Sequence, residues 1–218
     1  MPNITLVRHG QANSAAKDET SYDQLSDLGW TQARWLGDHM RATGDHFQRI
    51  YAGTLNRQVD TARGMMGDAV EIVQDPRLNE LSYFTMAQLL DDQQGIPLPD
   101  TREGYVAHLP KVFGAWMRDE IADVPERYAD FEKRVTDALD DIAAGHGRAV
   151  VVTSGGVISL VMRRVLGLDL MGWSQMALAI QNTSVHRLHL VGDRPMLAQF
   201  NATPHLEQPD RHHAQTHL

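Results

Sequence analysis

The feature that most constrains the fold is the run Ala149-Val150-Val151-Val152-Thr153, which is apolar at four successive positions. Neighbouring side chains of a β-strand point to opposite faces, so a strand of this composition has both faces covered. Such strands belong to parallel or mostly parallel sheets with helices packed on each side. The run therefore predicts the central strand of an α/β domain.

Segments typical of strands alternate along the chain with segments of helical period. Short strands are expected at 4–7, 50–52 and 70–73, and a closing hairpin at 184–191 and 196–200 around Gly192-Asp193. Helices are expected at 26–40 behind the cap Ser26, at 55–66 behind the cap Thr54, from Pro125 onward, and after Ser154 to about Gly167. This order predicts a three-layer α/β/α fold with a mostly parallel central sheet.

The chain has 218 residues, which is long enough to bury one sizeable core, and we expect a single α/β domain over residues 1–206. The composition changes between 81 and 124, where the loop 95–100 separates two segments, and we interpret 81–124 as an inserted helical lid over the site. Residues 207–218 are polar and rich in histidine, so we expect a mobile tail there.

The composition excludes several classes of function. The formal net charge is −8, and a surface for nucleic acid or anionic membrane needs a basic stripe, so neither partner is expected. The chain has no cysteine, which excludes disulfides, thiolate nucleophiles and cysteine-based zinc sites. It shows neither a signal peptide nor a long apolar stretch, so a cytoplasmic location is the simplest interpretation.

Three polar or glycine-rich turns follow predicted strands, namely Arg8-His9-Gly10, Gly53-Thr54 and Ser154-Gly155-Gly156. Ligands of open α/β sheets bind beyond the carboxyl ends of the strands. Because the carboxyl ends of parallel strands meet at one edge of the sheet, we expect these turns to converge on one site.

His9 stands just past a buried strand, between the permanent cation Arg8 and a flexible glycine. Imidazole is a good nucleophile near neutral pH, and a guanidinium can bind two phosphate oxygens at once. The pattern suits attack on phosphorus, although a surface Arg-His pair has the same sequence. Arg57 favours the first interpretation, because a cation in the first turn of a helix opposes the macrodipole unless an anion binds there. A solvated Arg57 paired with Asp60 is the alternative.

Two further positions can serve phosphate chemistry. The turn Ser154-Gly155-Gly156 lets backbone N–H groups approach an anion at a helix N-terminus, and the Ser154 hydroxyl can donate one hydrogen bond. Ser154 can equally be an ordinary helix cap. Glu80 opens the insertion, and a carboxylic acid kept protonated by burial can protonate the leaving oxygen of a phosphate ester. A glutamate at this position can also be a simple surface residue.

Taken together, these segments resemble the histidine phosphatase superfamily, also called the phosphoglycerate mutase-like family. The matching segments lie in the family's order and span about residues 3–206: 6–12 (LVRHGQA), 25–33 (LSDLGWTQA), 50–62 (IYAGTLNRQVDTA), 77–80 (RLNE), 153–158 (TSGGVI) and 182–185 (NTSV). The resemblance implies a phosphoglycerate mutase-like fold and a phosphohistidine mechanism.

In that mechanism His9 is the nucleophile, Arg8 and Arg57 hold the phosphoryl oxygens, and Glu80 acts as general acid and then as general base. Ser154 and Gly155 would complete the phosphate site. The resemblance also implies a small phosphorylated substrate and neither a metal nor an organic cofactor, and it does not specify an oligomeric state.

One departure from the family pattern concerns Ser154. Family members usually carry Ser-His-Gly-Gly where this chain has Thr-Ser-Gly-Gly at 153–156. Charge-assisted hydrogen bonds are about twice as strong as neutral ones, so loss of the second imidazole predicts an enzyme about tenfold to hundredfold slower. A weakly active or inactive phosphate-binding module on the same fold is the alternative. A serine hydrolase that uses Ser154 is disfavoured, because G-x-S-x-G is absent from this turn.

Two features favour a phosphatase over a phosphoglycerate mutase. Seven carboxylates accompany three basic residues, Arg102, Lys111 and Arg118, between 83 and 124, whereas a lid for a highly anionic sugar phosphate should be richer in cations. Residues 81–84 read LSYF, where mutases tend to carry Arg-His-Tyr-Gly or close variants. We therefore expect a phosphomonoesterase, with Phe84, Trp116 and Met117 as candidates to contact an apolar part of the substrate.

Overall fold

The computed structural model describes residues 3–13, 16, 18–191 and 194–217. Six strands form one sheet in the order β3-β2-β4-β1-β5-β6. Their bounds are β1 Asn3–Arg8, β2 Arg49–Ala52, β3 Val73–Gln74, β4 Ala149–Thr153, β5 Val185–Val191 and β6 Arg194–Ala202. The first four strands of that order are parallel to one another, β5 pairs antiparallel with β1, and β6 pairs antiparallel with β5. The mostly parallel sheet is thereby confirmed, and the hairpin turn predicted at Gly192-Asp193 lies outside the described residues.

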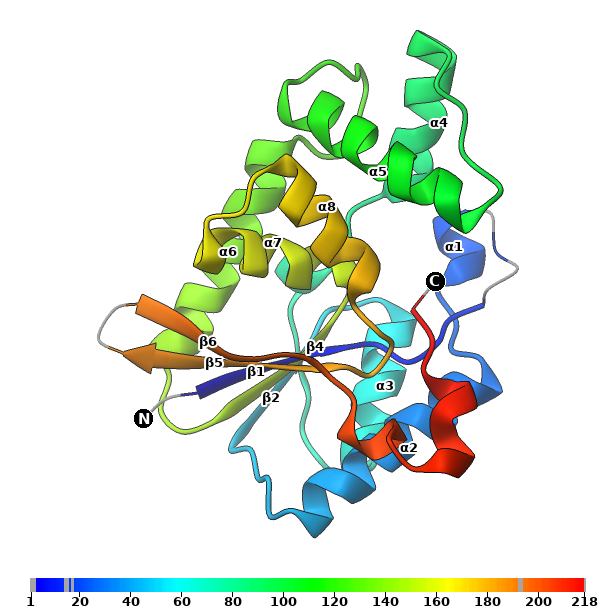
Figure 1. Ribbon diagram of the computed structural model, residues 1–218. Coiled ribbons are helices and arrows are strands. Elements are labelled where there is room, and N and C mark those ends of the chain that lie inside the picture. Colours follow the sequence, from blue (N-terminus) through cyan, green and yellow to red (C-terminus); the bar gives the residue numbers. More distant parts are fainter. Residues whose placement is uncertain (1–2, 14–15, 17, 192–193, 218) are drawn as a thin grey trace.

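Helices cover both faces of the sheet and make three layers (Figure 1). The helices α2 (Asp27–Ala42) and α3 (Asn56–Met66) pack on one face, and α6 (Tyr128–Ala144) and α7 (Gly155–Leu166) on the other. Alternate residues of β4 serve the two layers: Val150 and Val152 join the α2–α3 cluster, whereas Val151 joins the α6–α7 cluster. The three-layer α/β/α prediction is therefore confirmed, with β4 buried at every position.

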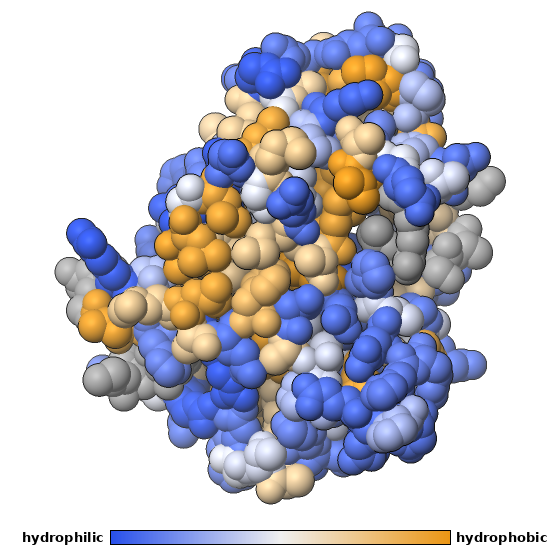
Figure 2. All heavy atoms as spheres, in the orientation of Figure 1, coloured by the Kyte–Doolittle hydropathy of each residue, from blue (hydrophilic) through white to orange (hydrophobic). Residues whose placement is uncertain are grey.

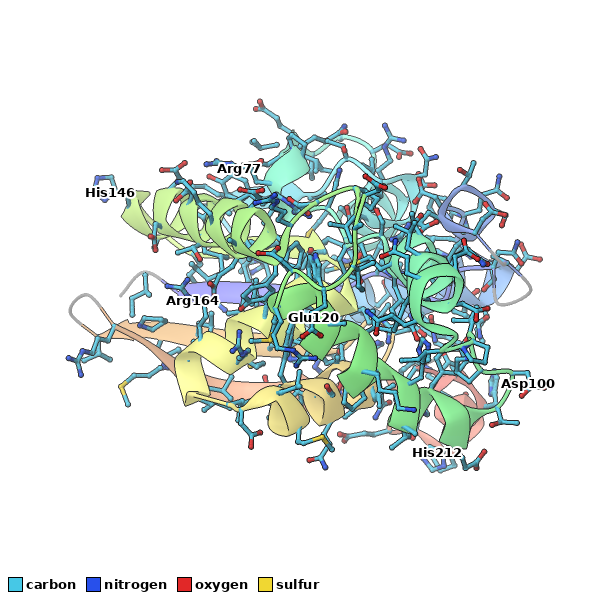
Figure 3. The ribbon with its side chains drawn as sticks, turned by 90° about the horizontal axis from the view of Figure 1, so that it is seen from above. Arg77, Asp100, Glu120, His146, Arg164 and His212 are labelled. Carbon is cyan, nitrogen blue, oxygen red and sulfur yellow. The ribbon has the colours of Figure 1, made fainter. Side chains whose placement is uncertain are left out.

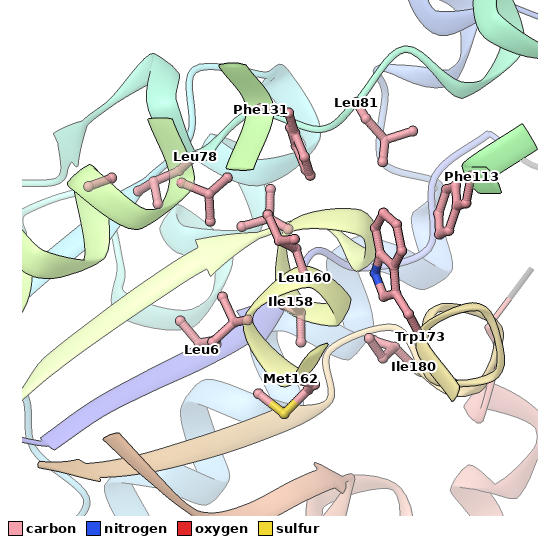
Figure 4. Packing of buried hydrophobic residues seen from close by; sticks show 14 of the residues in the cluster. Leu6, Leu78, Leu81, Phe113, Phe131, Ile158, Leu160, Met162, Trp173 and Ile180 are labelled. Atoms are coloured by element: carbon pink, nitrogen blue, oxygen red, sulfur yellow. The ribbon is translucent and has the colours of Figure 1, made fainter. Parts of the chain in front are cut away.

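The larger hydrophobic cluster lies on the α6–α7 side and extends to the segment 81–124 (Figure 4). That segment contains α4 (Tyr83–Gln94) and α5 (Arg102–Met117), and α5 packs on α8 (Leu170–Ala179). Phe113 of α5 stacks on Trp173 of α8 with ring centroids 4.1 Å apart. No helix in the described part of the chain is long and apolar enough to cross a membrane.

The start of α3 differs from the prediction that Thr54 caps it. Leu55 occupies the cap position without a side-chain bond, and the Asp23 carboxylate accepts hydrogen bonds from the backbone N–H groups of Asn56 and Arg57, at 2.9 and 3.1 Å. The Thr54 hydroxyl instead accepts a hydrogen bond from Asn79. Asp23 follows the short helix α1 (Glu19–Tyr22), so a residue distant in sequence takes the capping role.

Two other elements begin away from their predicted positions. The third strand is Val73–Gln74 rather than 70–73. The helix expected from Pro125 begins at Tyr128, with Arg127 at its cap position, and the carbonyl of Glu126 before it accepts a hydrogen bond from the indole of Trp116.

The C-terminal segment packs against the domain, which differs from the mobile tail that its polar composition predicts. Two short 3₁₀ helices, η2 (Pro204–Leu206) and η3 (Pro209–Ala214), lie against α2. Ala214 is buried, its carbonyl accepts a hydrogen bond from Gln32, and the Arg211 guanidinium lies 4.5 Å from the ring centre of Trp35. The polar side chains of this segment face outward over α2 in Figure 2, so the composition reflects an exposed outer face.

Candidate active site

His9 follows β1 directly and its backbone is fixed from three sides. The N–H of His9 donates to the carbonyl of Thr153 on β4, and its own carbonyl accepts a hydrogen bond from Asn182. The next N–H, of Gly10, donates to the Thr61 hydroxyl on α3. Gly10 has no side chain to clash with α2: a Cβ there would lie 2.5 Å from the carbonyl oxygen of Gly29. The nucleophile candidate is therefore held by β4, by the loop before β5 and by the helical layer of α2 and α3.

The His9 ring is buried, with 1% exposure, and its two nitrogens have different partners. Nδ1 lies 2.7 Å from the Gly10 carbonyl, which assigns the proton to Nδ1. Nε2 then carries the lone pair, and the Arg57 Nε–H donates to it at 3.3 Å. Burial lowers the pKa of His9 well below its usual value, and the charges of Arg57 and then Arg8 lower it further. The ring is consequently neutral near pH 7, the form in which Nε2 can attack phosphorus.

Arg57 is the second residue of α3 and is 4% exposed. Its guanidinium pairs with the Asp23 carboxylate at 3.0 Å and lies 5.1 Å from the ring centre of Tyr22. Asp60, the partner considered from sequence, instead pairs with Arg63 at 3.6 Å. The segment 22–23 thus aims the Arg57 side chain at His9.

Arg8 extends into the same region from the last position of β1. Its NH1 group donates to the carbonyls of Ile180 and His217, at 2.5 and 2.6 Å. Its Nε–H is buried and has no hydrogen-bond partner among the residues that the structure describes. A Cβ placed on Gly155 would lie 3.8 Å from this Nε, so the free donor faces the N-terminus of α7. An oxyanion bound there would satisfy it.

At the end of β4, Ser154 occupies the cap position of α7, but its side chain does not cap the described helix. It accepts a hydrogen bond from Gln58 at 2.8 Å. The capping role falls to half-buried Glu80, whose Oε2 accepts from the Gly156 N–H at 3.0 Å. A Cβ on Gly156 would lie 2.2 Å from the Glu80 carboxylate, so this approach requires glycine. Glu80 therefore sits at the N-terminus of α7 rather than on an open surface.

Arg8, Arg57, Glu80, Gly155 and Gly156 border a cavity of about 380 Å³ between the sheet edge and the segment 81–124, whereas the buried His9 and Ser154 are not among its described lining residues. Its charged lining residues in the described chain are Arg8, Arg57, Glu19, Glu80 and Asp100. Its aromatic lining residues are Tyr22, Tyr83, Phe84, Tyr105 and Phe113. Asp100, on the loop between α4 and α5, lies at the outer edge of the molecule in Figure 3. The described lining of the cavity thus combines two guanidinium groups with three carboxylates and five aromatic rings.

The aromatic side chains form a continuous wall that starts at the candidate nucleophile. Successive ring centroids from His9 through Tyr22, Phe84 and Tyr83 to Tyr105 are 6.1 to 6.2 Å apart. Of the residues considered for an apolar substrate, Phe84 lines the cavity, whereas Trp116 is 1% exposed and belongs to the core. Among the described side chains, no three of His, Asp or Glu are grouped so that they could hold a metal ion.

The structure brings together all six residues that the sequence nominates: Arg8, His9, Arg57, Glu80, Ser154 and Gly155. Sequence reasoning missed Asp23, Gln58 and Asn182, which hold Arg57, Ser154 and His9 respectively. The sequence around Asp23 and around Gln58 does not indicate their roles, because their hydrogen-bond partners lie 34 and 96 positions away in the chain. Thr61 could have been predicted from the sequence, because it lies four residues after Arg57 in a helix and this spacing places both side chains on one face.

Comparison with known proteins gives relatives over the whole chain and over parts of it. A protein of Hydrogenobacter thermophilus named "Putative phosphoserine phosphatase 2" is 26% identical over 220 residues, covering 95% of this chain and 99% of its own length. The 2,3-bisphosphoglycerate-dependent phosphoglycerate mutase of Rhizobium etli is 33% identical over 90 residues. That match covers 38% of this chain and only 43% of the mutase.

Solved structures share the fold. A phosphoserine phosphatase mutant from Entamoeba histolytica, in complex with phosphoserine, superposes with a TM-score of 0.70 at 19% identity, over 94% of this chain and 100% of that one. The phosphoglycerate mutase of Bacillus anthracis also gives a TM-score of 0.70 at 19% identity, over 94% of each chain. The model of the histidine phosphatase superfamily, branch 1, matches residues 4–203. The chain therefore belongs to the histidine phosphatase superfamily.

Proposed function

We propose that this chain hydrolyses phosphoric monoesters through a phosphohistidine on His9. The observation that carries the proposal is the state of the His9 ring, whose Nδ1 proton is bound to the Gly10 carbonyl while Nε2 keeps its lone pair beside the Arg57 guanidinium. A buried neutral imidazole next to a fixed cation suits attack on an anionic phosphoryl group, because the cation offsets the charge of the arriving oxygens.

In the first step Nε2 forms a bond to phosphorus and the bond from phosphorus to the ester oxygen breaks. Arg57 turns its Nε–H from the ring to a phosphoryl oxygen, and the free Nε–H of Arg8 binds another. Glu80, in its protonated form, gives its proton to the leaving alcohol. In the second step Glu80 takes a proton from water as the water oxygen bonds to phosphorus and the bond from Nε2 to phosphorus breaks, so that neutral His9 and inorganic phosphate are released.

The lining of the cavity supports a phosphomonoesterase rather than a mutase. Its described lining offers an aromatic wall and the carboxylates of Glu19 and Asp100, which suit a small phosphate ester with an apolar or uncharged organic part. The named relatives include both phosphatases and mutases. We place this chain with the phosphatases.

Labelling tests the proposal directly. Incubation with a ³²P-labelled phosphoester followed by an acid–base stability series should reveal an acid-labile, base-stable label on the wild-type chain and none on His9→Ala. A panel of phosphoesters should be hydrolysed by wild type at least about 10³ times faster than by His9→Ala. Equal rates for the two proteins across the panel would sink the proposal.

The second candidate is a phosphate-ligand-binding module without useful turnover. It is favoured by one observation, the neutral Ser154 hydroxyl in the phosphate site where the family usually has a second imidazole. Such a module would bind a phosphorylated ligand tightly and return it unhydrolysed, so calorimetry followed by ³¹P NMR of the same sample separates the two functions.

A further inference from the structure

The side chains of Gln58 and Ser154 form a buried pair beside His9. Both residues have 0% exposure. The Gln58 Nε2 group carries two hydrogens and donates to Ser154 Oγ at 2.8 Å and to the Leu78 carbonyl at 3.2 Å. Rotating the carboxamide by half a turn would put its oxygen against the Leu78 carbonyl, two acceptors facing each other. The bond to Leu78 therefore favours the orientation in which Nε2 faces Ser154, and this orientation leaves the buried Gln58 Oε1 without a hydrogen-bond partner among the described residues.

This orientation decides what the Ser154 hydroxyl can do. Because Oγ accepts a hydrogen bond from Gln58, its proton must point elsewhere, and the described residues offer that proton no acceptor. Oγ is also free of the usual capping duty, since Glu80 accepts the Gly156 N–H instead. The backbone bond from His9 N–H to the Thr153 carbonyl places residue 154 beside His9. The hydroxyl is thus a buried donor without an acceptor in the described part of the chain, next to the proposed nucleophile.

We propose that Gln58 is a positioning residue for phosphoryl transfer, which holds the Ser154 hydroxyl as a hydrogen-bond donor to the phosphoryl group on His9. The inference rests on the proposed function, because it needs a phosphoryl group at His9. Gln58 acts through Ser154 and does not contact the substrate. The neutral serine then works as a donor of fixed direction, where a freely rotating hydroxyl would donate to phosphate only part of the time.

A double-mutant cycle tests the pairing. Gln58→Met keeps the length of the side chain and removes its hydrogen bonds. We therefore expect kcat for the best phosphoester of the panel to fall about two- to tenfold, the same loss that we expect for Ser154→Ala. In the Ser154→Ala background the same change should have no further effect. Gln58→Glu should lower kcat at least as much as Ser154→Ala, because a carboxylate accepts the serine proton and turns it away from the phosphate.

A matched control removes another fully buried glutamine. Gln32 bonds to the C-terminal segment, and Gln32→Met should change kcat by the same factor with Ser154 or with alanine at 154. Each variant is assayed well below its melting temperature. The same double-mutant cycle is also measured by the dissociation constant of vanadate, because vanadate binding can be measured without turnover.

The outcomes separate this inference from the proposed function. If wild type turns over and His9→Ala does not, but Gln58→Met matches wild type or lowers kcat equally in both backgrounds, then only the role of Gln58 is overturned. If wild type neither hydrolyses any phosphoester nor binds vanadate, both proposals fail.

Discussion

The carboxyl ends of β1 and β4 are neighbours in the sheet, yet the residues at the two ends differ in chemistry. The β1 end carries Arg8 and His9, and Arg57 reaches it from α3, so two buried guanidinium groups flank one neutral ring. The β4 end carries the neutral Ser154 and two glycines, and its partners are an amide and a carboxylate. Positive charge is concentrated on one side of the proposed phosphoryl position. The two ends should therefore differ in how much they contribute to catalysis.

The largest effect should come from removing a cation on the β1 side. Arg57→Ala should lower kcat/KM by about 10²- to 10³-fold, because a preorganised cation no longer offsets the phosphoryl charge. Ser154→Ala on the β4 side should cost only about two- to tenfold. Steady-state kinetics on one phosphoester compares them, with Arg63→Ala, an exposed arginine of the same helix, as the control that keeps full activity. Equal losses at Arg57 and Ser154 would refute the asymmetry.

Glu80 joins the two ends, since it caps α7 and lines the cavity. Glu80→Gln should slow hydrolysis of an alkyl phosphate by about 10²-fold, because the poor leaving group needs a proton. Hydrolysis of p-nitrophenyl phosphate should be much less affected, because that leaving group departs as an anion. The ratio of the two losses, measured on the same enzyme preparation, is the informative quantity. A common loss for both substrates would contradict the acid role.

The asymmetry can also be tested by adding charge to the β4 side. Ser154→His alone should be less active and less stable than wild type, because the imidazole would meet the Gln58 carboxamide that now lies 2.8 Å from Oγ. Removing that side chain as well, in Gln58→Ala/Ser154→His, should raise kcat roughly three- to tenfold above the single variant. Steady-state assays and thermal unfolding of wild type, the single variant and the double variant test these expectations. Higher activity of Ser154→His than of wild type would show that Gln58 does not block the site.

The smallest effect concerns stability rather than turnover. Burial lowers the pKa of His186 to about 3, helped by the charge of Arg8, and burial lowers the pKa of His205 to about 3 as well. The unfolded chain binds protons at these residues below about pH 6.5, whereas the folded chain does not until about pH 3, so stability falls as the pH drops between those values. Between these pH values, each such histidine lowers the free energy of unfolding by about 1.4 kcal/mol for every unit by which the pH falls. Urea unfolding at several pH values should show a shallower slope in His205→Gln.

The sequence indicates those parts of the fold that depend on local patterns. The apolar run 149–153 is the central strand, and Ser26 caps α2 through a hydrogen bond to the Gly29 N–H, because these preferences act within a few residues. Contacts between distant segments follow a different rule: Asp23 displaces Thr54 as the cap of α3, and Glu80 displaces the Ser154 side chain as the cap of α7. In both cases a carboxylate from another part of the chain is a stronger acceptor than the local hydroxyl.

The candidate site shows the same division. The sequence predicts its residue types and their order along the chain, and the structure brings these residues together at one edge of the sheet. Their orientation is not legible, because it depends on bonds such as those of Asp23 to Arg57 and of Gln58 to Ser154. The catalytic roles of His9, Arg8, Arg57 and Glu80 stay predictions until the kinetics above are measured.

The return of the C-terminal segment to β1 has a practical consequence for anyone who handles this protein. The carbonyl of His217 accepts a hydrogen bond from Arg8, so a purification tag or fusion partner joined on the carboxyl side of that residue would leave the molecule beside the cavity. The first strand begins at Asn3, at the opposite end from Arg8 (Figure 1). Extensions for immobilisation or labelling therefore belong at the amino terminus, where they stay clear of the guanidinium groups.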